Sequence, residues 1–74
     1  MKAIKTVSAM VHSVGRPVDG VEIIAESGNN NVLARYNGTY CTAVFNPFVC
    51  MYYVDDTYGA LTEEQAKMYY DNMR

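Results

Sequence analysis

The sequence contains no tryptophan, a single histidine, two prolines and two cysteines. The cysteines, Cys41 and Cys50, form no CxxC pair and have no histidine cluster beside them, so the sequence predicts no zinc site. No stretch approaches the roughly 18 apolar residues that a membrane-spanning helix requires, and polar residues interrupt the N-terminal segment, which is therefore not typical of a signal peptide. We expect a cytoplasmic protein with no cofactor, no membrane association and two buried thiols.

Patterns that indicate catalysis are also scarce. The one histidine, His12, lies at the end of the first expected strand and is more typical of a surface residue. Asp55 and Asp56 could offer oxygen ligands to a divalent metal, but adjacent residues of a strand point to opposite faces. The chain has no phosphate-binding glycine loop and no nucleophile elbow. We assign no catalytic residue and no metal ligand, and a non-enzymatic function is favoured.

The charge is nearly balanced, since six basic and eight acidic residues give a formal net charge of −2. Proteins that depend on phosphate contacts concentrate positive charge on one surface. Here the basic residues are scattered along the chain: Lys2, Lys5, Arg16, Arg35, Lys67 and Arg74. A modest patch of Lys2, Lys5 and Arg35 on the sheet stays an alternative to separately solvated charges.

Half of the 74 residues are apolar, and we expect one small domain over residues 1–74 with a thin core. Apolar residues alternate with the period of a strand, and short connections indicate antiparallel neighbours. The expected fold class is α+β: an antiparallel four- to five-stranded β-meander followed by one C-terminal α-helix. The expected strands cover about residues 2–12, 21–26, 32–36, 39–45 and 49–54, and the helix covers about residues 63–73.

The first two strands carry an alternating pattern. In the first, Val7, Ala9 and Val11 share a face, although Lys5 interrupts the alternation. In the second, one face takes Val21, Ile23 and Ala25, and the other takes Glu22 and Glu26.

The strongest local signal is Asn37-Gly38 between two β-rich segments. This pair favours a two-residue type I′ hairpin, in which both central residues have positive φ. Such a turn predicts that Arg35 faces Tyr40. One face would carry Val32, Ala34, Tyr36, Cys41, Ala43 and Phe45, and the other Leu33, Arg35, Tyr40, Thr42 and Val44.

A second turn is expected at residues 46–49, because Pro47 suits its second position. This turn would set Phe45 opposite Cys50 and leave Cys41 far along the ladder, which disfavours a disulfide. The strand 49–54 is apolar on both faces, so it is expected to be either central in the sheet or covered on both sides. We expect residues 55–59 to end the sheet.

A helix start signal follows at Thr62, with Gln65 three residues later in the pattern of a capping box. Leu61 and Ala66 are spaced as a hydrophobic staple. The predicted helix is too short to be stable alone, so it must dock on the sheet or on a partner. Its apolar face would carry Ala66, Tyr69, Tyr70 and Met73.

Seven tyrosines join two phenylalanines, which is more ring area than a thin core can hide. Tyrosine is enriched at interfaces because it combines contact area with a polar hydroxyl. We therefore expect a tyrosine-bearing binding surface. Its predicted residues are Arg35 and Tyr40 beside the hairpin turn, with Tyr52 and Tyr53 near them.

The segment 36–59 resembles small accessory proteins of phages and mobile elements, many of which resemble anti-defence inhibitors, including anti-CRISPR proteins. The resemblance implies a non-enzymatic protein that binds a host protein. The order of strands and then a helix also resembles the transcriptional-coactivator fold that binds single strands as a dimer. The alternative is therefore a nucleic-acid-binding dimer, with weak metal-dependent DNA nicking. A pocket for a small nucleotide signal between subunits is a third hypothesis.

Self-association as a homodimer or higher oligomer is expected in either case. A meander leaves two unpaired sheet edges, and one short helix cannot cover both faces of the sheet.

Overall fold

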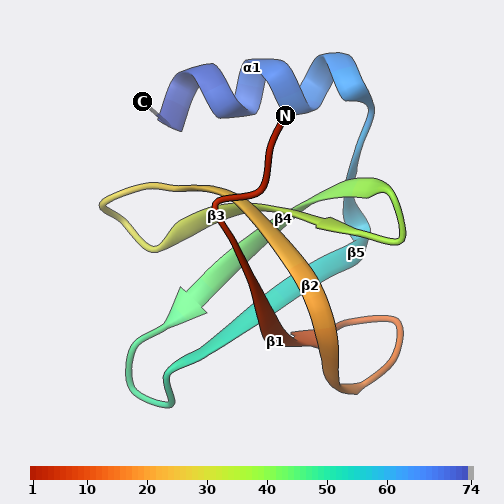
Figure 1. Cartoon of the computed structure of the whole chain (residues 1–74), viewed down its shortest axis with the longest axis vertical. Coiled ribbons are helices and arrows are strands. Elements are labelled where there is room, and N and C mark those ends of the chain that lie inside the picture. The colour runs from red at the N-terminus through yellow and green to blue at the C-terminus, as the bar shows by residue number, and fades with distance from the viewer. Residues whose placement is uncertain (74) are drawn as a thin grey trace.

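The computed structural model describes residues 1–73, and Arg74 lies outside the described residues. Five strands precede one helix, as Figure 1 shows. The elements are β1 (Lys5–Val11), β2 (Arg16–Glu26), β3 (Asn31–Tyr36), β4 (Thr39–Asn46), β5 (Met51–Leu61) and α1 (Glu63–Met73). No helix within the described residues is long and apolar enough to cross a membrane.

The five strands close into a barrel in the order β1-β2-β3-β4-β5. The α+β class, the strand succession and the C-terminal helix are confirmed, but the prediction of an open, wholly antiparallel meander is wrong. Successive strands pair antiparallel, so the first and fifth strands run in the same direction and must pair parallel when the sheet closes. This closing pair joins residues 9–11 of β1 to residues 52–54 of β5. Closure removes the two free edges on which the expectation of self-association partly rested.

A β-bulge in β2 changes which face its side chains occupy. Ile23 pairs with Ala34 and Ala25 pairs with Leu33, which leaves Ile24 as an extra residue on β2. Ile23 therefore points into the barrel while Ile24 points outward, and both are almost fully buried. The bulge also turns Ala25 outward and Glu26 toward the barrel end, so the predicted alternation is wrong beyond Ile23.

The Asn37-Gly38 hairpin is confirmed. Both residues have positive φ, 52° and 76°, and Arg35 pairs with Tyr40. The next turn differs from the prediction, because Phe45 pairs with Tyr52 and not with Cys50. The loop between β4 and β5 is longer than a tight turn, and Cys50 ends it at a φ of 52°.

The strand β5 continues to Leu61, so the expected end of the sheet at residues 55–59 is wrong. Thr42 pairs with Asp55, but Cys41, the residue before Thr42, pairs with Ala60. Residues 56–59 thus bulge from the ladder and the strand resumes after them. Gly59 folds back against the wall, and a Cβ added there would lie 2.1 Å from Thr42 Oγ1 and 2.6 Å from the Asp55 carbonyl oxygen.

The barrel encloses the main core. The six hairpin residues predicted to share one face all belong to it or, as with Tyr36 and Phe45, pack against it. Its buried members are Ala9, Val11, Val21, Ile23, Val32, Ala34, Cys41, Ala43, Tyr52 and Val54. The fifth strand begins at Met51 and not at residue 49, and it supplies Tyr52 and Val54 to this interior. Tyr53 stays exposed on its outer face, so the strand is not covered on both sides. Cys41 is buried as expected, but Cys50 is exposed, and both are free thiols.

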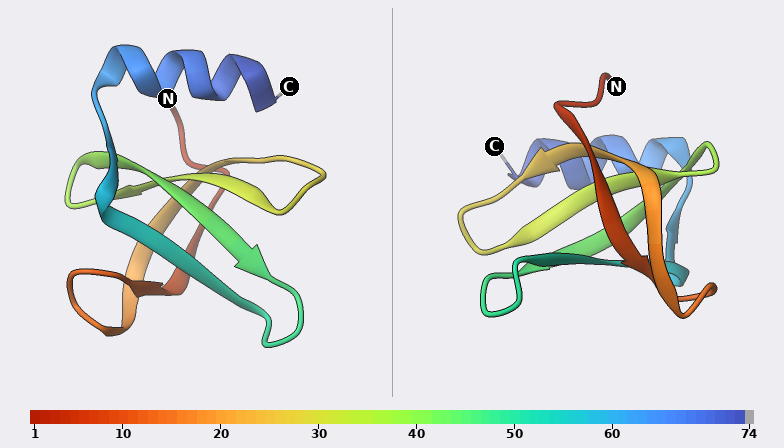
Figure 2. Two further views of the ribbon diagram at one scale, coloured as in Figure 1. Left: turned by 180° about the vertical axis from the view of Figure 1, so that it is seen from behind. Right: turned by 60° about the horizontal axis from the view of Figure 1, so that its bottom comes forward.

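The helix α1 covers a second, smaller core on the outside of the barrel. It crosses the top of Figure 1, at the end away from the β1–β2 and β4–β5 loops, and Figure 2 shows the same arrangement from two further sides. Ala66 packs there against Ile24 and Leu33, and all three are at most 2% exposed. The capping box is confirmed, since Gln65 N donates to Thr62 Oγ1 at 3.1 Å and Thr62 N donates to Gln65 Oε1 at 2.9 Å.

We predict that Gly59→Ala destabilises the protein by about 1–3 kcal/mol, because the new methyl group overlaps the backbone of Asp55 and the side chain of Thr42. Urea unfolding would measure the change. Gly28→Ala is the matched control, since an added Cβ there meets nothing within 4 Å. Equal stability of the two variants would contradict the proposed close packing of the bulge.

Candidate functional site

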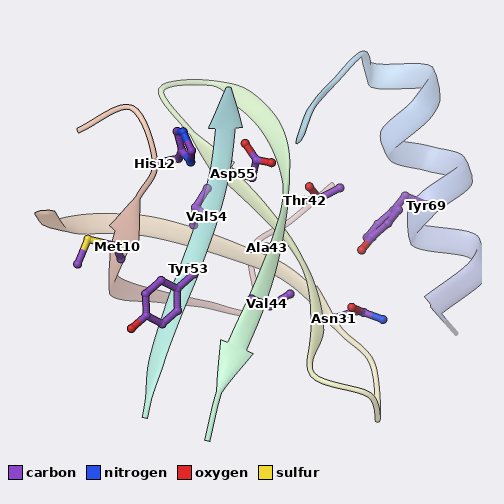
Figure 3. A pocket seen from close by; sticks show the side chains of 10 residues that line it. All are labelled: Met10, His12, Asn31, Thr42, Ala43, Val44, Tyr53, Val54, Asp55 and Tyr69. Atoms are coloured by element: carbon purple, nitrogen blue, oxygen red, sulfur yellow. The ribbon is translucent and has the colours of Figure 1, made fainter. Parts of the chain in front are cut away.

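An open groove of about 440 Å³ lies on the outer wall of the barrel, over the seam where β1, β5 and β4 meet (Figure 3). Its lining residues are Met10, His12, Asn31, Thr42, Ala43, Val44, Tyr53, Val54, Asp55 and Tyr69. The term "seam groove" denotes this set below. Six of these residues come from the consecutive strands β4 and β5, and barrel closure adds Met10 of β1 to the same lining.

An apolar row forms the floor of the seam groove. Tyr53 pairs with Met10 across the parallel seam and with Val44 across the antiparallel one. Directly paired residues point to the same side of a sheet, so these three side chains lie in a line on the outer wall. Val44 is 48% exposed and Tyr53 is 38% exposed. A contiguous apolar row that stays this open to solvent is typical of an interaction surface.

A polar row lies beside the apolar one, two residues farther along the strands on the same face. Thr42 pairs with Asp55, and His12 N donates to the Val54 carbonyl oxygen at 2.9 Å, which places His12 next to Asp55. Figure 3 shows His12, Asp55 and Thr42 at one end of the groove. The helix α1 contributes Tyr69, which lies on the side of the groove away from Met10. The groove is therefore amphipathic along its length.

The bulge of residues 56–59 holds the Asp55 carboxylate in place. Its Oδ1 accepts hydrogen bonds from the backbone N–H groups of Tyr58, at 2.9 Å, and Thr57, at 3.2 Å. These bonds, above all the one from Tyr58, hold the pKa of Asp55 below its usual value, and the nearby His12 acts in the same direction. Asp55 is therefore a fixed negative charge at neutral pH.

The adjacent Asp56 serves a different purpose. It accepts hydrogen bonds from the hydroxyl of Ser13 and from Ser13 N, the latter at 2.9 Å, which tie the β1–β2 loop to the bulge. Burial alone would raise the pKa of Asp56, but these bonds hold it below its usual value. Among residues 1–73, no group of three or more His, Cys, Asp or Glu side chains is placed to hold a metal ion.

The four predicted binding residues lie in three different places. Tyr53 is exposed in the seam groove. Tyr52, one residue before it, points into the barrel and is 8% exposed. Arg35 and Tyr40 pair on the β3–β4 wall beneath α1, where the Arg35 guanidinium lies 5.4 Å from the Tyr40 ring centroid. The structure therefore does not bring the predicted patch together.

Arg35 and Tyr40 are engaged in contacts within the chain. The guanidinium of Arg35 binds both carboxylate oxygens of Glu22, at 2.9 and 2.8 Å, and also donates to the Tyr40 hydroxyl at 3.1 Å and to the Met1 carbonyl oxygen at 2.9 Å. The Met1 amino group donates to the same hydroxyl at 3.2 Å. Hydrogen bonds from Arg35 lower the pKa of Glu22, and Glu22 raises that of Arg35. This network fixes the N-terminal segment against the barrel.

Tyr52 likewise makes contacts within the chain, at one open end of the barrel. Its hydroxyl donates to Glu26, which also lies 3.1 Å from the Lys5 ammonium, and that ammonium sits 5.4 Å from the Tyr52 ring centroid. Burial, above all, raises the pKa of the Tyr52 hydroxyl. These contacts explain why Lys5 interrupts the apolar alternation of its strand: it reaches the mouth of the barrel, where a cation finds a carboxylate.

The sequence contained a signal for part of the groove. The hairpin register already placed Val44 on the same face as Thr42 and Tyr40, and the structure shows that this face is the outer one. Met10 carried no such signal, because its proximity to Tyr53 depends on the parallel seam. Comparisons with models of protein families, with curated proteins and with solved structures give no significant match.

We predict that Glu22→Gln makes the melting temperature less sensitive to acid. The pKa of Glu22 is lowered in the folded state, so the unfolded state binds more protons as the pH falls. Its stabilising contribution is present above the unfolded value of about 4.3 and is lost as the pH falls through the lower folded value. Thermal melts between about pH 6 and pH 3 would measure this.

Arg35→Gln should reduce the acid sensitivity in the same way, since it removes the other half of the ion pair. An unchanged slope of melting temperature against pH in Glu22→Gln would refute a role for this pair.

Proposed function

We propose that this protein is a non-enzymatic interaction protein that binds a host protein through the seam groove, as expected of a phage or mobile-element accessory factor with an anti-defence role. The observation that carries the proposal is the row of Met10, Tyr53 and Val44. These side chains form a continuous apolar surface that the barrel and its helix leave open. Tyr53 is the predicted binding residue that this surface retains.

Contacts within the chain also favour this function over the nucleic-acid alternative. Two of the three basic residues expected to form a patch, Lys5 and Arg35, are held in ion pairs with Glu26 and Glu22. Phosphate binding would have to compete with those carboxylates. Weak metal-dependent nicking gains no support from Asp56, whose carboxylate is bound to Ser13.

We predict that Tyr53→Ala weakens binding to the host protein recovered with the wild-type chain by about 2 kcal/mol or more, which is roughly 30-fold. Tyrosine anchors at the centre of an interface commonly contribute on this scale. Titration calorimetry with the purified partner would measure the loss, after circular dichroism has shown that the variant is folded. Ile4→Ala is the control, because Ile4 is 60% exposed but lies outside the seam groove. Equal affinity of Tyr53→Ala and wild type would remove the groove from the interface.

Self-association stays a prediction, and it now rests on exposed apolar residues instead of free sheet edges. Phe48 is 95% exposed and Val49 is 57% exposed, both in the β4–β5 loop. We expect a homodimer or higher oligomer at micromolar concentration, and we expect Phe48→Ser to shift it toward a monomer. Light scattering decides this, and a wild-type mass of 8.3 kDa at every concentration would exclude the oligomer.

A further inference from the structure

The seam groove carries a negative charge and no lysine or arginine to balance it. Asp55 is the one carboxylate among its lining residues. Lys5 and Arg35 are directed elsewhere, into ion pairs with Glu26 and Glu22. A cationic group that enters the groove therefore meets an opposite charge, and the one lining side chain able to carry a positive charge is His12.

Aromatic rings flank the path to that carboxylate. Figure 3 shows the Tyr53 ring beside the seam and the Tyr69 ring projecting from α1, with Thr42 and Val44 between them and Asp55 toward one end. A guanidinium or ammonium group within about 6 Å of a tyrosine ring is attracted to its face. The methylene stem of such a side chain also packs well on an apolar row such as that of Met10, Tyr53 and Val44.

The Asp55 carboxylate is preorganised to bind a cation. Backbone N–H groups of the bulge fix its orientation through Oδ1, so binding costs little additional ordering of this side chain. The same bonds hold its pKa below the usual value. Its neighbour Asp56 is instead bound to Ser13 and does not line the groove. Asp55 is therefore the carboxylate that a cation in the groove would meet.

We infer that the seam groove binds a basic–apolar segment of a partner protein, with an arginine or lysine side chain laid along Tyr53 and its charged end at Asp55. Apolar residues on either side of that cation would cover Met10 and Val44. This inference rests on the proposed function and adds the chemistry of the partner. An acidic segment is disfavoured by the same carboxylate.

The test is a nuclear magnetic resonance titration of the full, isotope-labelled chain with blocked pentapeptides. One peptide has arginine at its centre between two leucines, and its control has citrulline there, which keeps the shape but lacks the charge. We expect the arginine peptide to shift the amide signals of Val44, Tyr53 and Asp55 and to bind about fivefold or more tightly than the citrulline peptide.

Two variants assign that preference to one carboxylate. Asp55→Asn keeps an oxygen that accepts the N–H bonds of the bulge, so the fold is retained while the charge is lost, and the fivefold preference should disappear. Asp19→Asn makes the same change in net charge outside the groove lining and should leave the preference intact.

Several results would overturn the inference. Equal affinities for the two peptides, with shifts still in the groove, would leave the interaction function standing but remove the basic partner. Changes in the amide signals of Glu22 or Glu26, and not of the groove residues, would place cation binding outside the seam groove. Groove shifts caused by a single-stranded oligothymidylate would indicate nucleic acid, and concentration-dependent groove shifts without peptide would indicate a second copy. Failure of the proposed function itself is read separately, from the Tyr53→Ala titration.

Discussion

The structure depends on the closure of an odd number of strands into a barrel. Because each strand pairs antiparallel with the next, the first and fifth run in the same direction, and the barrel closes through the short parallel pairing of residues 9–11 with residues 52–54. This seam joins the two ends of the sheet and leaves no free edge in the described part of the chain. It also places Met10 beside Tyr53, which completes the apolar row of the groove. The pairing that closes the fold thus also adds the β1 side of the candidate site.

Within residues 1–73, strand pairing is irregular at three places, one of them between Val7 and Ala9, and the other two position side chains as a regular ladder could not. The extra residue at Ile24 gives β2 two consecutive buried isoleucines, one for the barrel interior and one for the surface beneath α1. The bulge at residues 56–59 interrupts β5, orients Asp55 through backbone hydrogen bonds and lets the strand resume toward the helix. Gly59 makes that detour feasible, because any larger residue would overlap Thr42 and Asp55. Irregularity in the strands is therefore what connects the barrel core, the helix and the groove.

Local features of this fold were predictable from the sequence, and long-range ones were not. Asn37-Gly38 determined a turn type and with it the register of a whole hairpin, and Thr62 with Gln65 marked the helix start. Bulges carry no comparable signal, since an inserted residue such as Ile24 looks like an ordinary strand residue until its partners are known. The parallel seam is a property of strand number and closure, so neither Met10 nor the isolation of Tyr53 from Arg35 could be derived from alternation alone. Tyrosine abundance suggested a residue type for the binding surface but could not say which rings the fold itself uses.

The hydroxyl partners of the tyrosines separate those that maintain the fold from those available to a ligand. Tyr40 and Tyr52 each bond within the chain, to Arg35 and to Glu26, so replacing either one would disturb an ion-pair network as well as any interface. Tyr53 lies on the outer wall, where the residue is 38% exposed. A binding defect in Tyr53→Ala can therefore be attributed to the groove, whereas one in Tyr40→Ala or Tyr52→Ala could not be separated from a folding defect. The adjacent positions 52 and 53 thus divide between core and surface because successive residues of a strand face opposite sides.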